Sequence, residues 1–201
     1  ADQVRAPLTQ DESFLKIATN PAVLEVVRRC IGKFIVLMQQ NGIVNAPAPE
    51  PHHQTAWHRD LPYQHITTSR PIAINALFCV DPFEAEMGAT FMLPASHLRE
   101  EFPSEAYVRK HETQVYAKPG SYIVINSMLY HRAGWNRSNR KRRAVNNVYT
   151  IPYIKQQIAL PAALGGKWSD DPELSQLLGY ETDPPRSVAA YIHERARKSG
   201  N

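Results

Sequence analysis

The middle of the chain, from about residue 33 to residue 155, consists of short apolar runs that Pro, Gly and Asn interrupt. The runs are rich in β-branched and aromatic residues, which favour strands, and no helical periodicity separates them. The segments with this character are 33–40, 55–60, 71–80, 89–94, 114–117, 121–126 and 142–151. Short strands that follow one another without intervening helices predict an antiparallel sandwich or barrel.

Helical signals are confined to the two ends of the chain. Thr9 and Glu12 have the spacing of a capping box. The segment 20–32 begins with an asparagine cap and a proline and ends at a glycine, which together predict a helix. Segments 173–180 and 187–198 predict shorter helices near the C-terminus.

A length of 201 residues fits one domain with a core of its own. We therefore expect a single domain over residues 1–201. It would consist of a helical flank at about 9–32, a β core at about 33–155 and C-terminal helices at about 172–198.

The cysteines and the apolar runs bear on the cellular compartment of the protein. Cys30 and Cys79 are too few for a disulfide framework, which favours a reducing compartment. No apolar run approaches the roughly 20 residues of a membrane helix, and the first residues lack the apolar core of a signal peptide. We expect a cytoplasmic protein that does not associate with membranes.

Positive charge is concentrated in one place. The net charge is +4, and five of the seven residues from Arg137 to Arg143 are basic, so the remainder carries 4 − 5 = −1. Such a run could bind nucleic acid. The run lies in one turn between predicted strands and has no aromatic platform beside it, so we expect no nucleic-acid partner. Nucleic-acid binding or repair through residues 137–143 stays open as an alternative.

His58 and Asp60 are two residues apart in a segment that we expect to be extended. Residues i and i+2 of a strand face the same side, so both side chains would face one cavity, with Arg59 turned away. With a third histidine from another strand they would complete the two-histidine, one-carboxylate triad that holds Fe(II). Spacing alone favours a hydrogen-bonded structural pair over a metal site, so further residues are needed.

The segment from His131 to Thr150 supplies the missing parts of such a site. His131 follows a predicted strand and precedes a glycine-containing turn, and Arg142 begins the next strand. Alternate residues from Arg142 onward form a small, polar face suited to lining a cavity. An arginine at the mouth of that cavity could grip a carboxylate through two hydrogen bonds, as an acidic, iron-chelating co-substrate would require.

Three blocks, "WHRDL", "INALFCVDPFEAEMGATFMLPASH" and "YHRAGWNRSNRKRRA", resemble the signature blocks of the phytanoyl-CoA dioxygenase family. The resemblance covers about residues 13–154. Members of that family are Fe(II)- and 2-oxoglutarate-dependent oxygenases built on a double-stranded β-helix. The resemblance therefore implies a mainly β, jelly-roll or cupin-like fold with flanking α-helices at both ends.

The same resemblance implies the cofactors Fe(II), 2-oxoglutarate as co-substrate and O₂. The positions that match the catalytic iron ligands are His58, Asp60 and His131. Arg142 matches the arginine that pairs with the far carboxylate of 2-oxoglutarate, and Thr90 and Gln54 match further contacts to the co-substrate. Ala133 stands where relatives often carry a serine that assists the arginine.

Asp60 bears on the type of reaction. In iron halogenases of this superfamily the carboxylate ligand is replaced by Ala or Gly. The aspartate therefore favours hydroxylation of a small organic molecule, with release of succinate and CO₂, or a related oxidation such as desaturation or ring formation, and the sequence does not distinguish these reactions. The alternative is a metal-binding β-barrel without oxygenase activity, holding zinc on the same ligands. Neither the substrate nor the oligomeric state can be deduced, but segments 45–57, 61–70, 98–112 and 154–168 are the expected walls of a substrate pocket.

Overall fold

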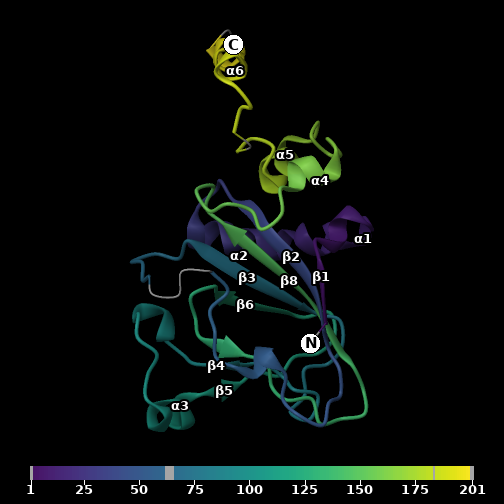
Figure 1. The fold of residues 1–201 in the computed structure, drawn as a ribbon, viewed down its shortest axis with the longest axis vertical. Helices are drawn as coiled ribbons and strands as arrows, with labels where there is room; N and C mark the ends of the chain where they lie inside the picture. The colour runs from purple at the N-terminus through teal and green to yellow at the C-terminus, as the bar shows by residue number, and fades with distance from the viewer. Residues whose placement is uncertain (1, 62–65, 183, 200–201) are drawn as a thin grey trace.

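The computed structural model describes residues 2–61, 66–182 and 184–199 (Figure 1). Within these residues the core is a pair of antiparallel sheets, one with the strand order β1-β2-β8-β3-β6 and one with the order β5-β4-β7. The larger sheet contains β1 (Asp2–Arg5), β2 (Val36–Asn45), β3 (Ala73–Cys79), β6 (Tyr122–Asn126) and β8 (Arg142–Thr150). The smaller sheet contains β4 (Phe91–Met92), β5 (Thr113–Gln114) and β7 (His131–Arg132). The mainly β, jelly-roll-like fold class is thus confirmed, although these sheets do not close into a barrel.

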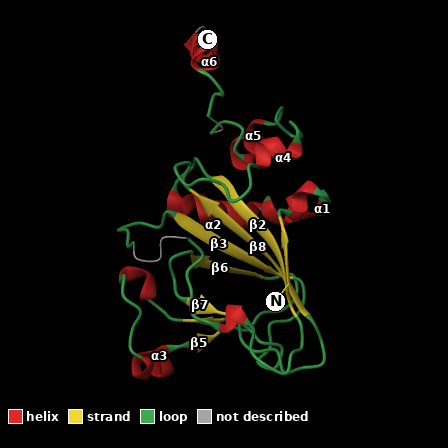
Figure 2. Cartoon of the chain, viewed as in Figure 1, coloured by secondary structure: helices red, strands yellow, loops and turns green. Residues whose placement is uncertain are grey.

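The helices of residues 13–31 and 160–178 cover the outer face of the larger sheet, and the smaller sheet lies on its other side together with the helix of residues 105–111 (Figures 1 and 2). The α-helices are α1 (Ser13–Ala18), α2 (Pro21–Ile31), α3 (Glu105–His111), α4 (Leu160–Leu164), α5 (Pro172–Leu178) and α6 (Val188–Ser199). Short 3-10 turns occur at η1 (Pro7–Thr9), η2 (His53–Thr55) and η3 (Ser96–Leu98). Helix α6 stands apart from the rest of the chain. No helix in the described ranges is long and apolar enough to cross a membrane.

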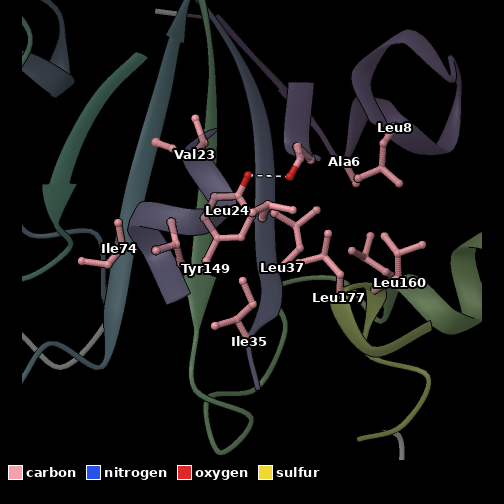
Figure 3. Close-up of a cluster of buried hydrophobic side chains, with 14 residues drawn as sticks. Ala6, Leu8, Val23, Leu24, Ile35, Leu37, Ile74, Tyr149, Leu160 and Leu177 are labelled. Carbon is pink, nitrogen blue, oxygen red and sulfur yellow. Dashed lines mark hydrogen bonds between the residues drawn. The ribbon is translucent and has the colours of Figure 1, made fainter. Parts of the chain in front are cut away.

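The main core fills the space between the larger sheet and helices α2, α4 and α5 (Figure 3). Leu37 of β2 and Tyr149 of β8 are fully buried there against Leu24 of α2. The Tyr149 hydroxyl donates a 2.7 Å hydrogen bond to the carbonyl oxygen of Ala18. Burial of each large apolar side chain contributes about 1.5–3 kcal/mol to the stability of the fold. This face of the larger sheet is therefore held firmly against the helices, and its opposite face lines a cavity.

Strand β8 shows the alternation that the sequence predicted. Tyr149 faces the helices, whereas Arg142 and Asn146 line a cavity on the other side of the sheet. Arg142 is 3% exposed, and its neighbour Arg143 is exposed and paired with Asp81 at 2.8 Å. The strand register is therefore the one in which Arg142, and not Arg143, points inward.

The expected strand at 55–60 is wrong. Residues 53–55 form turn η2, in which the His52 side chain accepts a hydrogen bond from the Gln54 N–H, and only His58 makes a bridge, to His131. The local hydrogen bond between the Gln54 N–H and the His52 side chain closes a turn here instead of an extended strand. His58 and Asp60 nevertheless reach the same cavity.

Helix starts were predicted with mixed success. The Thr9 hydroxyl bonds to Ala6 instead of capping a helix, and helix α1 begins at Ser13, whose N–H bonds to the Asp11 carboxylate. The expected capping box is therefore wrong. Asn20 caps α2 as predicted, since its side chain accepts from the Val23 N–H.

Candidate active site

His58, Asp60 and His131 come together on one side of the cavity, with a potential ligand atom from each lying within 4.8 Å of the others. The Asp60 Oδ1 atom is 3.7 Å from His58 Nε2 and 3.5 Å from His131 Nε2. A pair of backbone hydrogen bonds, each 3.0 Å long, joins His58 to His131. The sheet-like bridge thereby fixes the two imidazoles side by side.

Backbone carbonyl groups set the orientation of both imidazoles. His58 Nδ1 lies 2.9 Å from the Ala56 oxygen, and His131 Nδ1 lies 2.9 Å from the Leu129 oxygen. A carbonyl oxygen only accepts, so each Nδ1 carries a proton and donates it. The Nε2 atoms are consequently the ones directed at Asp60 and available to a metal, as in most histidine-ligated sites.

The two carboxylate oxygens of Asp60 have different partners. Oδ2 accepts hydrogen bonds from the side-chain amides of Asn75 and Asn146, the second at 2.9 Å. Ser127 in turn donates to the Asn75 side-chain oxygen. This network leaves Oδ1 to face the histidines. The sequence analysis missed Asn75, although an asparagine within the apolar run 71–80 was a usable signal.

Burial and charge act against each other in this cluster. Burial raises the pKa of Asp60, but the charge and hydrogen bond of His131, with smaller effects from His58 and Asn146, hold it below its ordinary value. Burial lowers the pKa of His131, and Asp60 outweighs this and raises it. Burial and the nearby His131 lower the pKa of His58. An ionised carboxylate between two imidazoles is a site that favours a cation.

The donor set fits a divalent transition metal. Two imidazole nitrogens and one carboxylate oxygen are the ligands of non-haem Fe(II) oxygenases, and they also suit catalytic zinc. The Asn146 Oδ1 atom is buried and has no hydrogen-bond partner among the described residues, so a metal-bound water could satisfy it. The chemistry of this donor set therefore fits iron.

Arg142 lies inside the cavity rather than at its mouth, where the sequence analysis expected it. Its guanidinium lies 4.2 Å from the centre of the Phe83 ring, and its Nε donates to the Met87 carbonyl oxygen at 3.3 Å. Burial lowers the pKa of Arg142 to about 10, so the group stays charged at neutral pH. No carboxylate forms an ion pair with Arg142 in the described part of the chain, since Asp81 pairs with Arg143. An anionic ligand would compensate this buried charge.

All six predicted site residues line the same cavity, which has a volume of about 420 Å³. They are Gln54, His58, Asp60, Thr90, His131 and Arg142. Thr90 is buried beside the smaller sheet, and Gln54 lies in η2. The volume is in the range of sites for small organic molecules.

The outer wall of the cavity differs from the expected one. Segment 98–112 contributes no residue to it, and segment 154–168 contributes only Gln157. Segment 45–57 does contribute, through His53, Gln54 and Ala56, whereas residues 62–65 of segment 61–70 lie outside the described residues. The wall residues that the sequence analysis missed are Gln3, Arg5, Gln39, Asn41 and Ile43. These residues lie at alternate positions of β1 and β2, so their side chains face the same side of the sheet. This alternation can be recognised only once β1 is known to be a strand.

Comparison with known sequences gives two findings. A sequence model of the phytanoyl-CoA dioxygenase family matches residues 1–144. The uncharacterized protein Rv1501 of Mycobacterium tuberculosis is 34% identical over 167 residues, which are 81% of this chain and 60% of that protein. The chain thus spans less than two thirds of the length of this relative.

Solved structures share the fold at low sequence identity. The epimerase SnoN in complex with Fe3+, alpha ketoglutarate and nogalamycin RO matches with a TM-score of 0.62 and 17% identity, over 75% of this chain and 63% of SnoN. EctD from S. alaskensis with 2-oxoglutarate and 5-hydroxyectoine matches with a TM-score of 0.62 and 18% identity, over 74% of this chain and 56% of EctD. Because the sequence identities are this low, the two matches show a common fold alone.

Proposed function

The chain belongs to the phytanoyl-CoA dioxygenase family, and from that membership we propose that it is an Fe(II)- and 2-oxoglutarate-dependent oxygenase acting on a small organic molecule. The observation that carries the proposal is the cavity that His58, Asp60, His131 and the buried Arg142 line together. This cavity offers what the proposed chemistry would need: two imidazoles and a carboxylate to hold the metal, and a cation for the far carboxylate of the co-substrate.

Each residue has a defined task in this proposal. His58, Asp60 and His131 hold the iron through Nε2, Oδ1 and Nε2, and Arg142 binds the distal carboxylate of 2-oxoglutarate. Iron, 2-oxoglutarate and O₂, when bound, supply the oxidising chemistry, with succinate and CO₂ as by-products. SnoN and EctD, which share the fold, were solved with 2-oxoglutarate under its two names, and this supports the assignment of the co-substrate.

The remaining cavity residues orient the reactants. Asn75 and Asn146 fix the rotation of Asp60, so that Oδ1 is the oxygen presented to the metal. Leu77 and Ile123 give the cavity an apolar wall that keeps water away from the reacting groups. Thr90 and Gln54, which both line the cavity, are proposed to contact the co-substrate.

Hydroxylation is the reaction we propose. Asp60 fills the carboxylate position, so the site lacks the vacancy through which halide would enter the metal sphere. SnoN is an epimerase on the same fold, so the fold by itself does not select hydroxylation. The choice of hydroxylation therefore depends on Asp60 and on the substrate.

Two other functions compete with this proposal. The same three ligands could hold zinc in a binding protein without oxygenase activity. The basic run could bind nucleic acid, but its side chains diverge: Arg140 pairs with Glu84, Arg143 pairs with Asp81, and Arg142 points into the cavity. A dispersed run offers no continuous cationic stripe, so we favour the oxygenase.

Succinate formation from 2-oxoglutarate tests the proposal. We expect formation that requires added Fe(II) and O₂ and that His131→Ala abolishes. The neighbouring arginines provide a matched pair: Arg142→Gln should raise the concentration of 2-oxoglutarate needed at least about tenfold, because a buried charge-assisted contact is lost. Arg143→Gln, on the outer face, should leave it unchanged. Metal-independent succinate formation, or equal effects of the two variants, would refute the proposed site.

A further inference from the structure

We propose that the substrate carries an oxyanion group and that Arg5 of β1 binds this group at the outer side of the cavity. This inference rests on the proposed function, because it assigns the substrate class of the same site. It is carried by the arrangement of side chains across the larger sheet, by the surroundings of Arg5 and by its distance from the metal ligands.

One row of side chains crosses the larger sheet beneath the metal ligands. In order of paired strands the row reads Arg5, Asn41, Asn146, Leu77 and Ile123, and all five line the cavity. Asn146, in the middle, donates to Asp60 and so marks the position of the metal. The row is apolar on the β3 and β6 side of this point and polar on the β2 and β1 side.

The polar side is made of amides and one cation. Gln3, Gln39 and Gln157 line the cavity around Arg5 and Asn41. Side-chain amides can donate to hydroxyl and carbonyl oxygens and accept from hydroxyl groups, so this wall suits a polar molecule.

Arg5 is oriented by neutral groups and, among the described residues, has no acidic partner. Its Nη1 donates to Gln157 Oε1 at 3.3 Å. With the Asn41 amide oriented to satisfy its surroundings, Asn41 Oδ1 also accepts from Arg5 Nη1 at 2.9 Å. No acidic side chain in the described ranges forms an ion pair with Arg5. A guanidinium held in place without an acid is suited to bind an incoming oxyanion.

Arg5 and Arg142, which both line the cavity, are placed for different ligands. Arg142 is buried, and Arg5 is exposed where a molecule from solution arrives. Two strand spacings, or roughly 10 Å, separate the backbones of β1 and β8. Arg5 is therefore within reach of a substrate group that lies a few bonds from the carbon that would be oxidised at the metal. Arg142 thus serves the co-substrate, and Arg5 selects a small, polar, anionic substrate.

Arginine side-chain NMR tests this assignment directly. The protein is loaded with Zn(II), which is diamagnetic, and saturated with 2-oxoglutarate, and the Nε–H signals of Arg5 and Arg142 are followed. The probes are N-acetylglycine, its neutral counterpart N-acetylglycinamide, and inorganic sulfate at constant ionic strength. We expect the Arg5 signal to shift saturably with N-acetylglycine, with sulfate or with both, and not with the amide. The two anions distinguish a carboxylate site from one for tetrahedral oxyanions.

Variants separate recognition by Arg5 from general effects of charge. Arg5→Gln should weaken binding of the anion about tenfold, and Arg5→Lys should retain most of it. Arg29→Gln, an exposed arginine on α2 paired with Glu25, should change nothing. Equal binding of acid and amide, no saturable shift with either anion, or unchanged binding in Arg5→Gln would each overturn the inference. Failure of the Arg142 signal to respond to 2-oxoglutarate would instead refute the proposed function, and the Arg5 result would still be readable.

Discussion

At the scale of single residues, Asp60 shows how the fold orients a proposed metal ligand. Two asparagine amides, from Asn75 and Asn146, hold Oδ2, so Oδ1 is oriented toward His58 and His131 before any metal arrives. Such outer contacts are ordinary in metal sites, where they fix the direction and basicity of the ligand.

Removal of one of these amides should weaken the metal site without unfolding the protein. We expect Asn146→Ala to lower the affinity for Co(II) or Zn(II) about tenfold to a hundredfold, because Asp60 gains rotational freedom. Competition with a chromogenic chelator measures the affinity. Asn139→Ala, in an exposed turn, is the control and should bind as the wild type does. Equal affinities for all three proteins would show that Asn146 does not position Asp60.

The two cysteines should differ sharply in reactivity. Cys79 is fully buried, and burial raises its pKa to about 11, so its thiol stays protonated near neutral pH, whereas Cys30 is exposed. A thiol titration at about pH 8 should therefore detect one group in the folded protein and two after unfolding. Cys30→Ser should reduce the folded value to zero. Rapid reaction of both thiols in the folded protein would contradict the burial of Cys79.

At the scale of elements, a stacked pair joins the two segments that carry the proposed metal ligands. Arg59 lies between His58 and Asp60, and its guanidinium is 4.1 Å from the ring centre of Tyr130, the residue before His131. The Arg59 guanidinium also donates to the carbonyl oxygens of Ser96 and Arg99. The contact therefore fixes one ligand segment against the other.

Substitutions at Tyr130 should separate the ring from its hydroxyl group. Tyr130→Leu removes the ring and should lower the free energy of unfolding by about 2 kcal/mol and weaken metal binding. Tyr130→Phe keeps the ring and loses only the 3.3 Å hydrogen bond to Glu100, so its metal affinity should match that of the wild type. Urea denaturation and metal titration give the two quantities. Equal metal affinity in Tyr130→Leu would show that the stack plays no part in positioning the ligands.

At the scale of the whole molecule, helix α6 contributes little to the body that holds the site. Its apolar side chains Val188, Tyr191 and Ile192 are all exposed, and the helix stands away from the sheets (Figure 1). Truncation after Thr182 should thus change the free energy of unfolding by less than about 0.5 kcal/mol and leave metal binding intact. Urea denaturation of the two lengths checks this. A loss of more than about 1 kcal/mol would mean that α6 packs on the body.

The parts of the molecule that could be predicted from sequence are those with a local signal. Alternation along 142–151 gave the inward direction of Arg142, and the asparagine cap gave the start of α2. Strand β1 could not be predicted, because its polar residues carry no strand signal and only its pairing with β2 makes it one. The polar cavity wall depends on that pairing and was missed with it. The two-residue strands β4 and β7 are likewise defined by their partners.

The central claim is that one cavity binds Fe(II) through the triad and 2-oxoglutarate through Arg142. Anaerobic titration of the metal-free protein with both tests it, because the chelate absorbs weakly at roughly 500–530 nm. We predict that the wild type shows this band and that the His131→Ala variant does not. The Arg142→Ala variant should show the band only at a much higher concentration of 2-oxoglutarate. A folded, iron-loaded wild type that shows no band would contradict the account and favour a zinc or binding function.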